Sequence, residues 1–406
     1  MTTLRLDDSG VLPMLDITAV QAALREYDCD GWLLYDFRGL NLLAQRLLAL
    51  EEKKLSRRWF YLIPVQGEPR KVVHAIEPGA LDHLPGRKVV YRRWQELEQG
   101  VGQVLAGCHR VALEYSPRNA NPYVSRVDGG TVELIRACGC EPVSSGDLIQ
   151  LFEATWDADQ EHSHFEAARL CRLAFDAAFD FILSQIRQHG SVTESAVQKH
   201  ILQFFDTQDL TTYSPPIVAA NAHSGDPHFE TCPEQDVAIG PGTYVLIDLW
   251  AKKKQPRAVY ADYTRAAYVG ERVPEEIERV FRVVVAARDA GIRYVQEAFA
   301  SRRPLQGWEV DAVVRDVIDS AGYGEYFTHR TGHNIGQEVH GNGAHMDGFE
   351  TREERRLIPR TAFSIEPGVY LPQFGVRSEV NVYIDAAATV HITGGEPQQE
   401  IHLLRP

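Results

Sequence analysis

An order of elements that occurs twice in the second part of the chain constrains the fold most. Residues 158 to 400 read as two amphipathic helices followed by strands and a hairpin, and then as the same order again. Two such halves are expected to face each other across a pseudo-twofold axis. A cleft between similar halves is a usual place for a site. The sequence therefore predicts an α+β domain with an internal duplication.

The first half shows clear helix and strand signals. A broad apolar face begins a long helix near residue 158, and Gly190 ends it. Ser191–Glu194 has the form of a capping box that opens a second helix through Phe205. Strand-like runs follow at Tyr244–Leu249 and Ala258–Tyr268, and the short segment between them predicts a hairpin.

The second half repeats these signals. Apolar stripes predict helices over residues 275–300 and 309–321, and Gly322 stands where a left-handed cap is expected. Strands are expected again up to Phe363–Ile365 and over Val380–Ile384.

The N-terminal part has a different texture. Residues 1 to about 155 alternate short apolar runs with helical patterns, and strands are expected at Trp32–Tyr35, Trp59–Val65, Lys71–Ile76 and Val111–Tyr115. We therefore expect an α/β domain over residues 1–156 and the duplicated domain over residues 157–406. The first contains no constellation of catalytic residues, so a scaffold or dimerisation role is favoured.

Charge and composition exclude several classes of protein. The net charge of −14 disfavours a nucleic-acid partner. No stretch of about 18 apolar residues is present to span a membrane, and the N-terminus does not resemble a secretion signal. The six cysteines are scattered, which favours reduced thiols in a cytoplasm. Short basic runs such as Arg355-Arg356 are interpreted as solvated surface.

Each half of the second domain ends in a hairpin that carries two carboxylates. Asp248 and Asp262 stand 14 positions apart, and Glu366 and Glu379 stand 13 apart. Asp248 and Glu366 follow apolar residues that should be buried, and a buried carboxylate needs a cation. Lysine or arginine could supply it, and any one of these acids alone is more often a surface or salt-bridge residue.

Four carboxylates together favour metal ions instead. With His333 as an imidazole ligand, they suit two manganese, cobalt, iron or zinc ions. A metal pair can activate water and polarise a carbonyl, which is hydrolytic chemistry. A lone histidine between glycines is, however, more often structural.

Five segments carry a resemblance to a known family. They are Asp248, Asp262 with the following Tyr-Thr-Arg, HRTGHNIG at 329–336, SIEPG at 364–368 and GVRSE at 375–379. These resemble the signatures of the pita-bread metallopeptidases, which include prolidase, aminopeptidase P and methionine aminopeptidase. The resemblance covers residues 158 to about 395, and the N-terminal region resembles the creatinase-type lobe of prolidases and aminopeptidases P.

The resemblance implies a role for each metal ligand. Asp248 and Asp262 would hold one metal ion, Asp262 and Glu379 would bridge, and His333 and Glu366 would complete the second site. Glu366 would also act as the proton shuttle. Two divalent ions per chain are expected, manganese first, with cobalt, zinc or iron as alternatives.

Three further residues match substrate-binding positions of the family. His228 would contact substrate, His340 would stabilise the tetrahedral intermediate, and Arg377 would bind the proline carboxylate. Alternatively, Arg377 pairs with a ligand carboxylate and His228 is an ordinary loop histidine. His223, His329 and His345 are interpreted as supporting or surface residues.

The sequence also departs from the family pattern. Asn334 follows the ligand histidine where glycine is usual, and Gly341-Asn342-Gly343 follows His340 where glutamate and prolines are common. Val380-Asn381 stands where an acidic residue is frequent. No ligand is lost, so these changes are expected to alter the rim of the pocket.

The resemblance implies hydrolysis of the Xaa-Pro bond in dipeptides, as in prolidase. It also favours a homodimer formed through the N-terminal lobe, and the cysteine pattern favours a cytoplasmic location. An aminopeptidase P that acts on longer Xaa-Pro peptides is the alternative. A non-peptidase hydrolase or lyase and a non-catalytic binding module on the same fold are further options, because fold does not fix chemistry. The expected partner is a proline-containing di- or oligopeptide.

Overall fold

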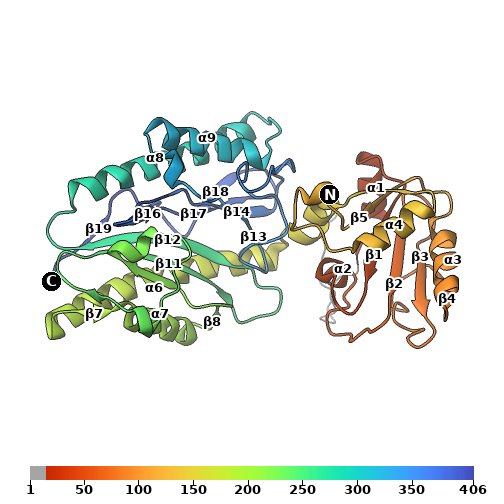
Figure 1. Ribbon diagram of the computed structural model, residues 1–406, viewed down its shortest axis with the longest axis horizontal. Helices are drawn as coiled ribbons and strands as arrows, with labels where there is room; N and C mark the ends of the chain where they lie inside the picture. Colours follow the sequence, from red (N-terminus) through yellow and green to blue (C-terminus); the bar gives the residue numbers. More distant parts are fainter. Residues whose placement is uncertain (1–14) are drawn as a thin grey trace. The chain divides into compact units, whose positions relative to one another are not determined.

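The computed structural model describes residues 15–406, which form two compact units divided after Thr155 (Figure 1). The interpretation that the chain begins without a secretion signal depends mainly on residues 1–14, which lie outside this range. Within residues 15–406, no helix combines the length and the apolar character needed to cross a membrane.

The first unit is built on a six-stranded mixed sheet with the order β4-β3-β2-β1-β5-β6. Its strands are β1 (Gly31–Asp36), β2 (Trp59–Pro64), β3 (Arg70–His74), β4 (Arg87–Tyr91), β5 (Arg110–Leu113) and β6 (Glu141–Ser144). Its longer helices are α1 (Ile17–Glu26), α2 (Leu42–Leu47), α3 (Trp94–Leu105) and α4 (Gly129–Ala137).

The central strand β1 is buried on both faces. Trp32 and Leu34 pack into one hydrophobic core, and Leu33 and Tyr35 pack into the other. Alternate side chains of a strand point to opposite faces, so helices on both sides of the sheet bury every residue of this apolar run. The four expected strands are confirmed. The edge strands β4 and β6 were not expected: β6 contains no apolar run, and β4 contains only the short run Val89–Tyr91.

The second unit begins with the first of two similar halves. Its main elements are α6 (Ala158–His189), α7 (Glu194–Thr207), β9 (Ile217–Ala220), β11 (Tyr244–Lys253) and β12 (Ala261–Val269). Strands β9, β11 and β12 pair in that order, each antiparallel to the next. The expected hairpin is therefore confirmed, and Gly190 ends α6 in the left-handed conformation with φ 85°.

The second half repeats this arrangement. Its main elements are α8 (Glu275–Ala300), α9 (Gly307–Ser320), β13 (Asn334–Ile335), β14 (Thr361–Ile365) and β17 (Val380–Ile384). Strands β13, β14 and β17 also pair in order and antiparallel. Gly322 follows α9 with φ 82°, as expected. In Figure 1 the helices α6 and α7 lie on one side of the strands of this unit, and α8 and α9 lie on the other.

One expected helix start is wrong. The N-cap of α7 is Thr193, whose side chain accepts from the Ala196 N–H, and not Ser191. The chain before it forms the short strand β7 (Val192–Thr193), which moves the helix start by two residues. Glu194 is buried instead of closing a capping box, and it accepts the Ala220 N–H at 2.7 Å and contacts His223 Nδ1 at 2.9 Å.

Gly291 allows α8 to lie close to both α9 and β14. A Cβ atom at this position would lie 2.6 Å from Val314 on α9 and 3.4 Å from Ile365, the last residue of β14. Because Gly291 has no side chain, α8 can pack closely against α9 and against the end of β14.

We predict that Gly291→Ala destabilises the protein by about 1–3 kcal/mol through overpacking, although alanine favours a helix interior by about 1 kcal/mol. Urea denaturation measures the change. Gly102→Ala in helix α3 is the matched control, because its nearest non-local atom would be 3.9 Å away. A Gly291→Ala protein as stable as the Gly102→Ala protein would contradict the account of close packing.

Candidate metal centre

Strands β11 and β12 place two carboxylates on one face of their sheet. Asp248 lies opposite Thr264, and Asp262 lies opposite Trp250. Residues two apart on a strand share a face, so Asp248 and Asp262 are diagonal neighbours across the hairpin. Both side chains are buried.

The second hairpin supplies the other carboxylates in the same way. Glu366 follows the last residue of β14 and Glu379 precedes the first residue of β17, and these strands pair through Ile365 and Val380. Glu366 and Glu379 are therefore the next residues on the two strands, just beyond the last pair of the ladder. His333 precedes β13 and its carbonyl accepts the Ser364 N–H at 2.8 Å, which places the imidazole beside the end of β14.

The structure brings the five expected ligands into one cluster. His333 Nε2 lies 3.2 Å from Glu366 Oε1 and 3.5 Å from Asp262 Oδ2. One ligand atom each of Asp262, His333 and Glu379 lies within 4.8 Å of the others. Asp248 joins them electrostatically, because its negative charge contributes to the raised pKa of Glu366 and Glu379.

Three carboxylate oxygens in this cluster are buried without a hydrogen-bond donor among residues 15–406. They are Asp248 Oδ1, Asp262 Oδ1 and Glu379 Oε1. Leaving such atoms without a partner is costly, and hard divalent cations prefer oxygen ligands. The donor set of four carboxylates and one imidazole therefore fits divalent metal ions.

The carboxyl groups of the cluster have raised pKa values, because they are buried without enough positive charge nearby to stabilise their ionised forms. Burial raises the pKa of Asp248 to about 6 and that of Asp262 to about 7. Burial also raises the pKa of Glu366 and, strongly, that of Glu379, and the neighbouring carboxylates add to both. The pKa of His333 is lowered by burial, which keeps its imidazole in the neutral form that binds metals.

Three polar residues without an assigned role hold these ligands in place. Thr264 donates its hydroxyl to Glu379 Oε2 at 2.9 Å, and Ser364 donates to Glu366 Oε1 at 3.0 Å while accepting the His333 N–H at 2.9 Å. Asn381 accepts the Asp262 N–H at 2.9 Å and donates to the Asp262 carbonyl at 2.6 Å. The sequence could have indicated a role for Thr264, because it stands two positions from the ligand Asp262 on the same strand and therefore shares its face.

Arg377 lies inside the cluster, and each of its three side-chain nitrogens donates to a protein group. Its Nη2 donates to Asp248 Oδ2 at 2.6 Å, its Nε to Thr264 Oγ1 at 3.0 Å and its Nη1 to the Tyr370 hydroxyl at 2.9 Å. The Tyr370 hydroxyl lies 2.7 Å from His329 Nε2, so the network continues to that half-buried histidine. The alternative of a pair between Arg377 and a ligand carboxylate is the arrangement observed.

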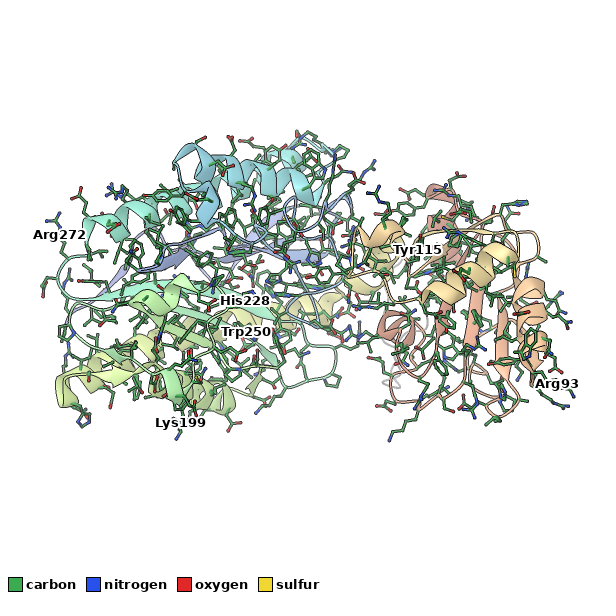
Figure 2. All side chains as sticks on the ribbon, in the orientation of Figure 1. Arg93, Tyr115, Lys199, His228, Trp250 and Arg272 are labelled. Atoms are coloured by element: carbon green, nitrogen blue, oxygen red, sulfur yellow. The ribbon has the colours of Figure 1, made fainter. Side chains whose placement is uncertain are left out.

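The two expected substrate histidines are both exposed. The His340 ring centroid lies 4.3 Å from that of His333. His228 contributes to the lowered pKa of His329 and His340, so it lies near these two histidines. Figure 2 shows His228 and Trp250 in the middle of the second unit, between its two helix pairs. The structure therefore places His340 beside the expected ligand His333, and His228 near His340.

An aromatic group beside the cluster was not expected. Trp250 lies opposite Asp262, and Tyr213 stacks on it with ring centroids 6.0 Å apart. Tyr213 remains 68% exposed and meets Tyr260 edge-on at 6.3 Å. Single aromatic residues scattered over 48 positions of sequence gave no signal of this grouping.

Two departures from the expected motifs are not at a rim. Asn334 and Asn381 are both buried, Asn334 at 1% exposure and Asn381 at 0%. Their amides bind backbone groups inside the fold, so neither residue lines a rim itself, and the expected effect on the pocket rim stays a prediction.

The chain is similar in sequence to known peptidases. The chain is 26% identical over 359 residues to a probable dipeptidase PepE of Mycobacterium tuberculosis, covering 85% of this chain and 86% of that protein. It is 32% identical over 217 residues to an Xaa-Pro dipeptidase of Lactobacillus delbrueckii, which covers 53% of this chain and only 54% of that enzyme.

The fold is shared with solved structures. The dipeptidase PepE of Mycobacterium ulcerans superposes with a TM-score of 0.71 at 23% identity, covering 96% of this chain and 97% of that one. This likeness confirms the expected α/β unit followed by an α+β unit. Residues 163–386, more than half of the chain and including all five expected ligands, match the sequence pattern of one family. The chain belongs to metallopeptidase family M24.

Proposed function

We propose that this protein hydrolyses the peptide bond before proline in Xaa-Pro dipeptides. Asp248, Asp262, His333, Glu366 and Glu379 would hold two divalent metal ions, with manganese as the first choice. The observation that carries this proposal is that Asp262 and Glu379 each offer a ligand atom within 4.8 Å of one on His333, while both carboxylates keep a buried oxygen without a hydrogen-bond donor among residues 15–406. The Xaa-Pro dipeptidase named among the relatives supports the substrate class.

Bound divalent ions would supply Lewis acidity and an activated water. The residues around them would do the remaining work. Glu366 is the candidate proton carrier, because its side chain is 16% exposed while those of Asp262 and Glu379 are more deeply buried. Ser364 orients it through a hydrogen bond of 3.0 Å. His340 and His228, both exposed beside the ligands, would bind the substrate carbonyl and orient the peptide.

The remaining expectations concern assembly and location. We propose residues 1–156 as a creatinase-type N-terminal domain through which two chains form a dimer in the cytoplasm. Light scattering is the test, and a particle with the mass of one chain at micromolar concentration would contradict the dimer.

Aminopeptidase P activity is the second candidate, and one observation favours it. Each of the three side-chain nitrogens of Arg377 already donates to a protein group, so neither edge of the guanidinium offers a terminal carboxylate two free N–H groups in this structure. A longer peptide would not need that contact, since its proline carboxyl is an amide.

We predict that chelator-stripped protein cleaves no Xaa-Pro peptide and that added manganese restores cleavage of Ala-Pro. Asp262→Ala and Glu379→Ala should each abolish metal binding and turnover, because each removes a ligand.

Metal content and hydrolysis of Ala-Pro and Ala-Pro-Ala are measured together. Glu166→Ala, in an exposed ion pair with Arg169, is the control and should keep both. Turnover retained by either ligand variant would contradict the site, and preference for Ala-Pro-Ala would assign the second candidate.

We predict that the metal-free protein loses stability as pH rises from about 4 to about 7. Asp248 and Asp262 have folded pKa values of about 6 and about 7, above their ordinary 3.8. A raised pKa stabilises the fold below the unfolded pKa, and this contribution is lost as pH rises through the folded pKa. Bound manganese should remove the loss, because it compensates the ionised carboxylates. Urea midpoints that fall equally with and without metal would contradict this assignment.

We predict that Arg377→Ala separates the two candidate functions. If the side chain leaves Asp248 to bind a terminal carboxylate, its loss should raise KM for Ala-Pro by about 10-fold or more while KM for Ala-Pro-Ala changes little. Steady-state kinetics on both peptides measures the difference. Equal losses on the two substrates would instead mean that Arg377 only holds Asp248 in place.

A further inference from the structure

Asn334 connects the ligand histidine to the loop that carries His340. It directly follows His333 and is buried. Its Nδ2 donates to the Ala362 carbonyl on β14 at 2.9 Å, and its Oδ1 accepts the Gly343 N–H at 2.8 Å. Its carbonyl also accepts the Gly341 N–H at 2.7 Å. The Asn334 side chain thus joins strand β14 to Gly343, which lies three residues after His340 in the same loop.

Two glycines of that loop make room for this side chain. A Cβ atom at Gly341 would lie 2.3 Å from Asn334 Oδ1. At Gly343 the three nearest atoms would all belong to Asn334, the closest at 2.5 Å. Neither glycine has a positive φ, so the backbone does not require glycine at these positions. The unusual residues at 334, 341 and 343 are therefore one structural unit, in which a large residue is accommodated by two small ones.

A buried ion pair holds the same loop from its other side. Arg355 donates to the Asn342 carbonyl at 2.7 Å and to the Gly343 carbonyl at 2.8 Å. Its partner Glu353, at 2.6 Å, accepts the His345 N–H at 3.3 Å. The expectation that Arg355-Arg356 is solvated surface is wrong for Arg355, which is buried because these carbonyls need a donor.

His340 is the exposed residue that this arrangement would position. It precedes Gly341, and its ring lies against that of His333 with centroids 4.3 Å apart. We propose that Asn334, seated between Gly341 and Gly343, is a positioning residue that fixes His340 over the metal ligands for the reaction. This inference rests on the proposed peptidase function. It assigns to Asn334 an effect on turnover that acts through His340 and not through metal binding.

The test uses the full-length, manganese-loaded protein. Asn334→Gly and Gly343→Ala should each lower kcat for the better of Ala-Pro and Ala-Pro-Ala by about 10-fold or more, with a smaller change in KM and with metal content retained. Gly343→Ala forces the Asn334 side chain out of its seat, so it tests the same contact if Asn334→Gly does not fold. Gly102→Ala, far from any such contact, is the control and should keep the parent kcat.

Double variants decide how the effect is transmitted. In the Asn334→Gly background, Gly343→Ala should cost nothing further, because the side chain it displaces is absent. In a His340→Ala background, Asn334→Gly should also cost nothing further, because the residue it positions is absent. Losses that multiply in the His340→Ala background, or a loss of metal in the single variants, would overturn the proposal.

Hydrogen exchange separates this inference from the proposed function. Residues 337–346 should exchange about 10-fold faster in Asn334→Gly, since the Gly343 N–H loses its acceptor. If the parent protein cleaves no peptide, the proposed function fails while exchange still reports on the contact. Unchanged exchange would overturn the contact itself.

Discussion

The burial of four carboxylates between two hairpins is the constraint on which the rest of the second unit depends. Burial raises the pKa values of Asp248, Asp262, Glu366 and Glu379, and neighbouring carboxylates add to the rise for all of them except Asp262. Without compensating positive charge this arrangement is unfavourable. Arg377 compensates Asp248 directly, and bound cations would compensate the others. The two helix pairs and the close packing at Gly291 keep water away from the backs of these strands.

The carboxylate cluster follows from the register of the two hairpins. Each hairpin carries its two acids at positions that the antiparallel register brings together, so two similar halves supply one pair each. Asn381 joins the halves by binding both backbone groups of Asp262 from the neighbouring strand. The site is thus a property of the interface between the halves, and neither half could assemble it alone.

Much of this was predictable from local patterns. Periodic apolar residues predict the helices α8 and α9 and the hairpin of β11 and β12. The spacing of the acidic residues can likewise be read directly from the sequence. Long-range contacts were not predictable in the same way. The pair of Arg377 with Asp248 spans 129 positions, and the seating of Asn334 between two glycines depends on a loop conformation that no periodicity encodes. The edge strand β6 was missed because its sequence, Glu-Pro-Val-Ser, contains no apolar run.

The central claim is that the five residues Asp248, Asp262, His333, Glu366 and Glu379 hold metal ions. Crystals grown with manganese and measured at its absorption edge test this most directly. The account predicts two anomalous peaks, both within coordinating distance of Asp262 and Glu379, with His333 and Glu366 on one ion and Asp248 on the other. An ordered structure in which these side chains show no anomalous peak, and in which Asp262 Oδ1 and Glu379 Oε1 bind other protein groups, would contradict it.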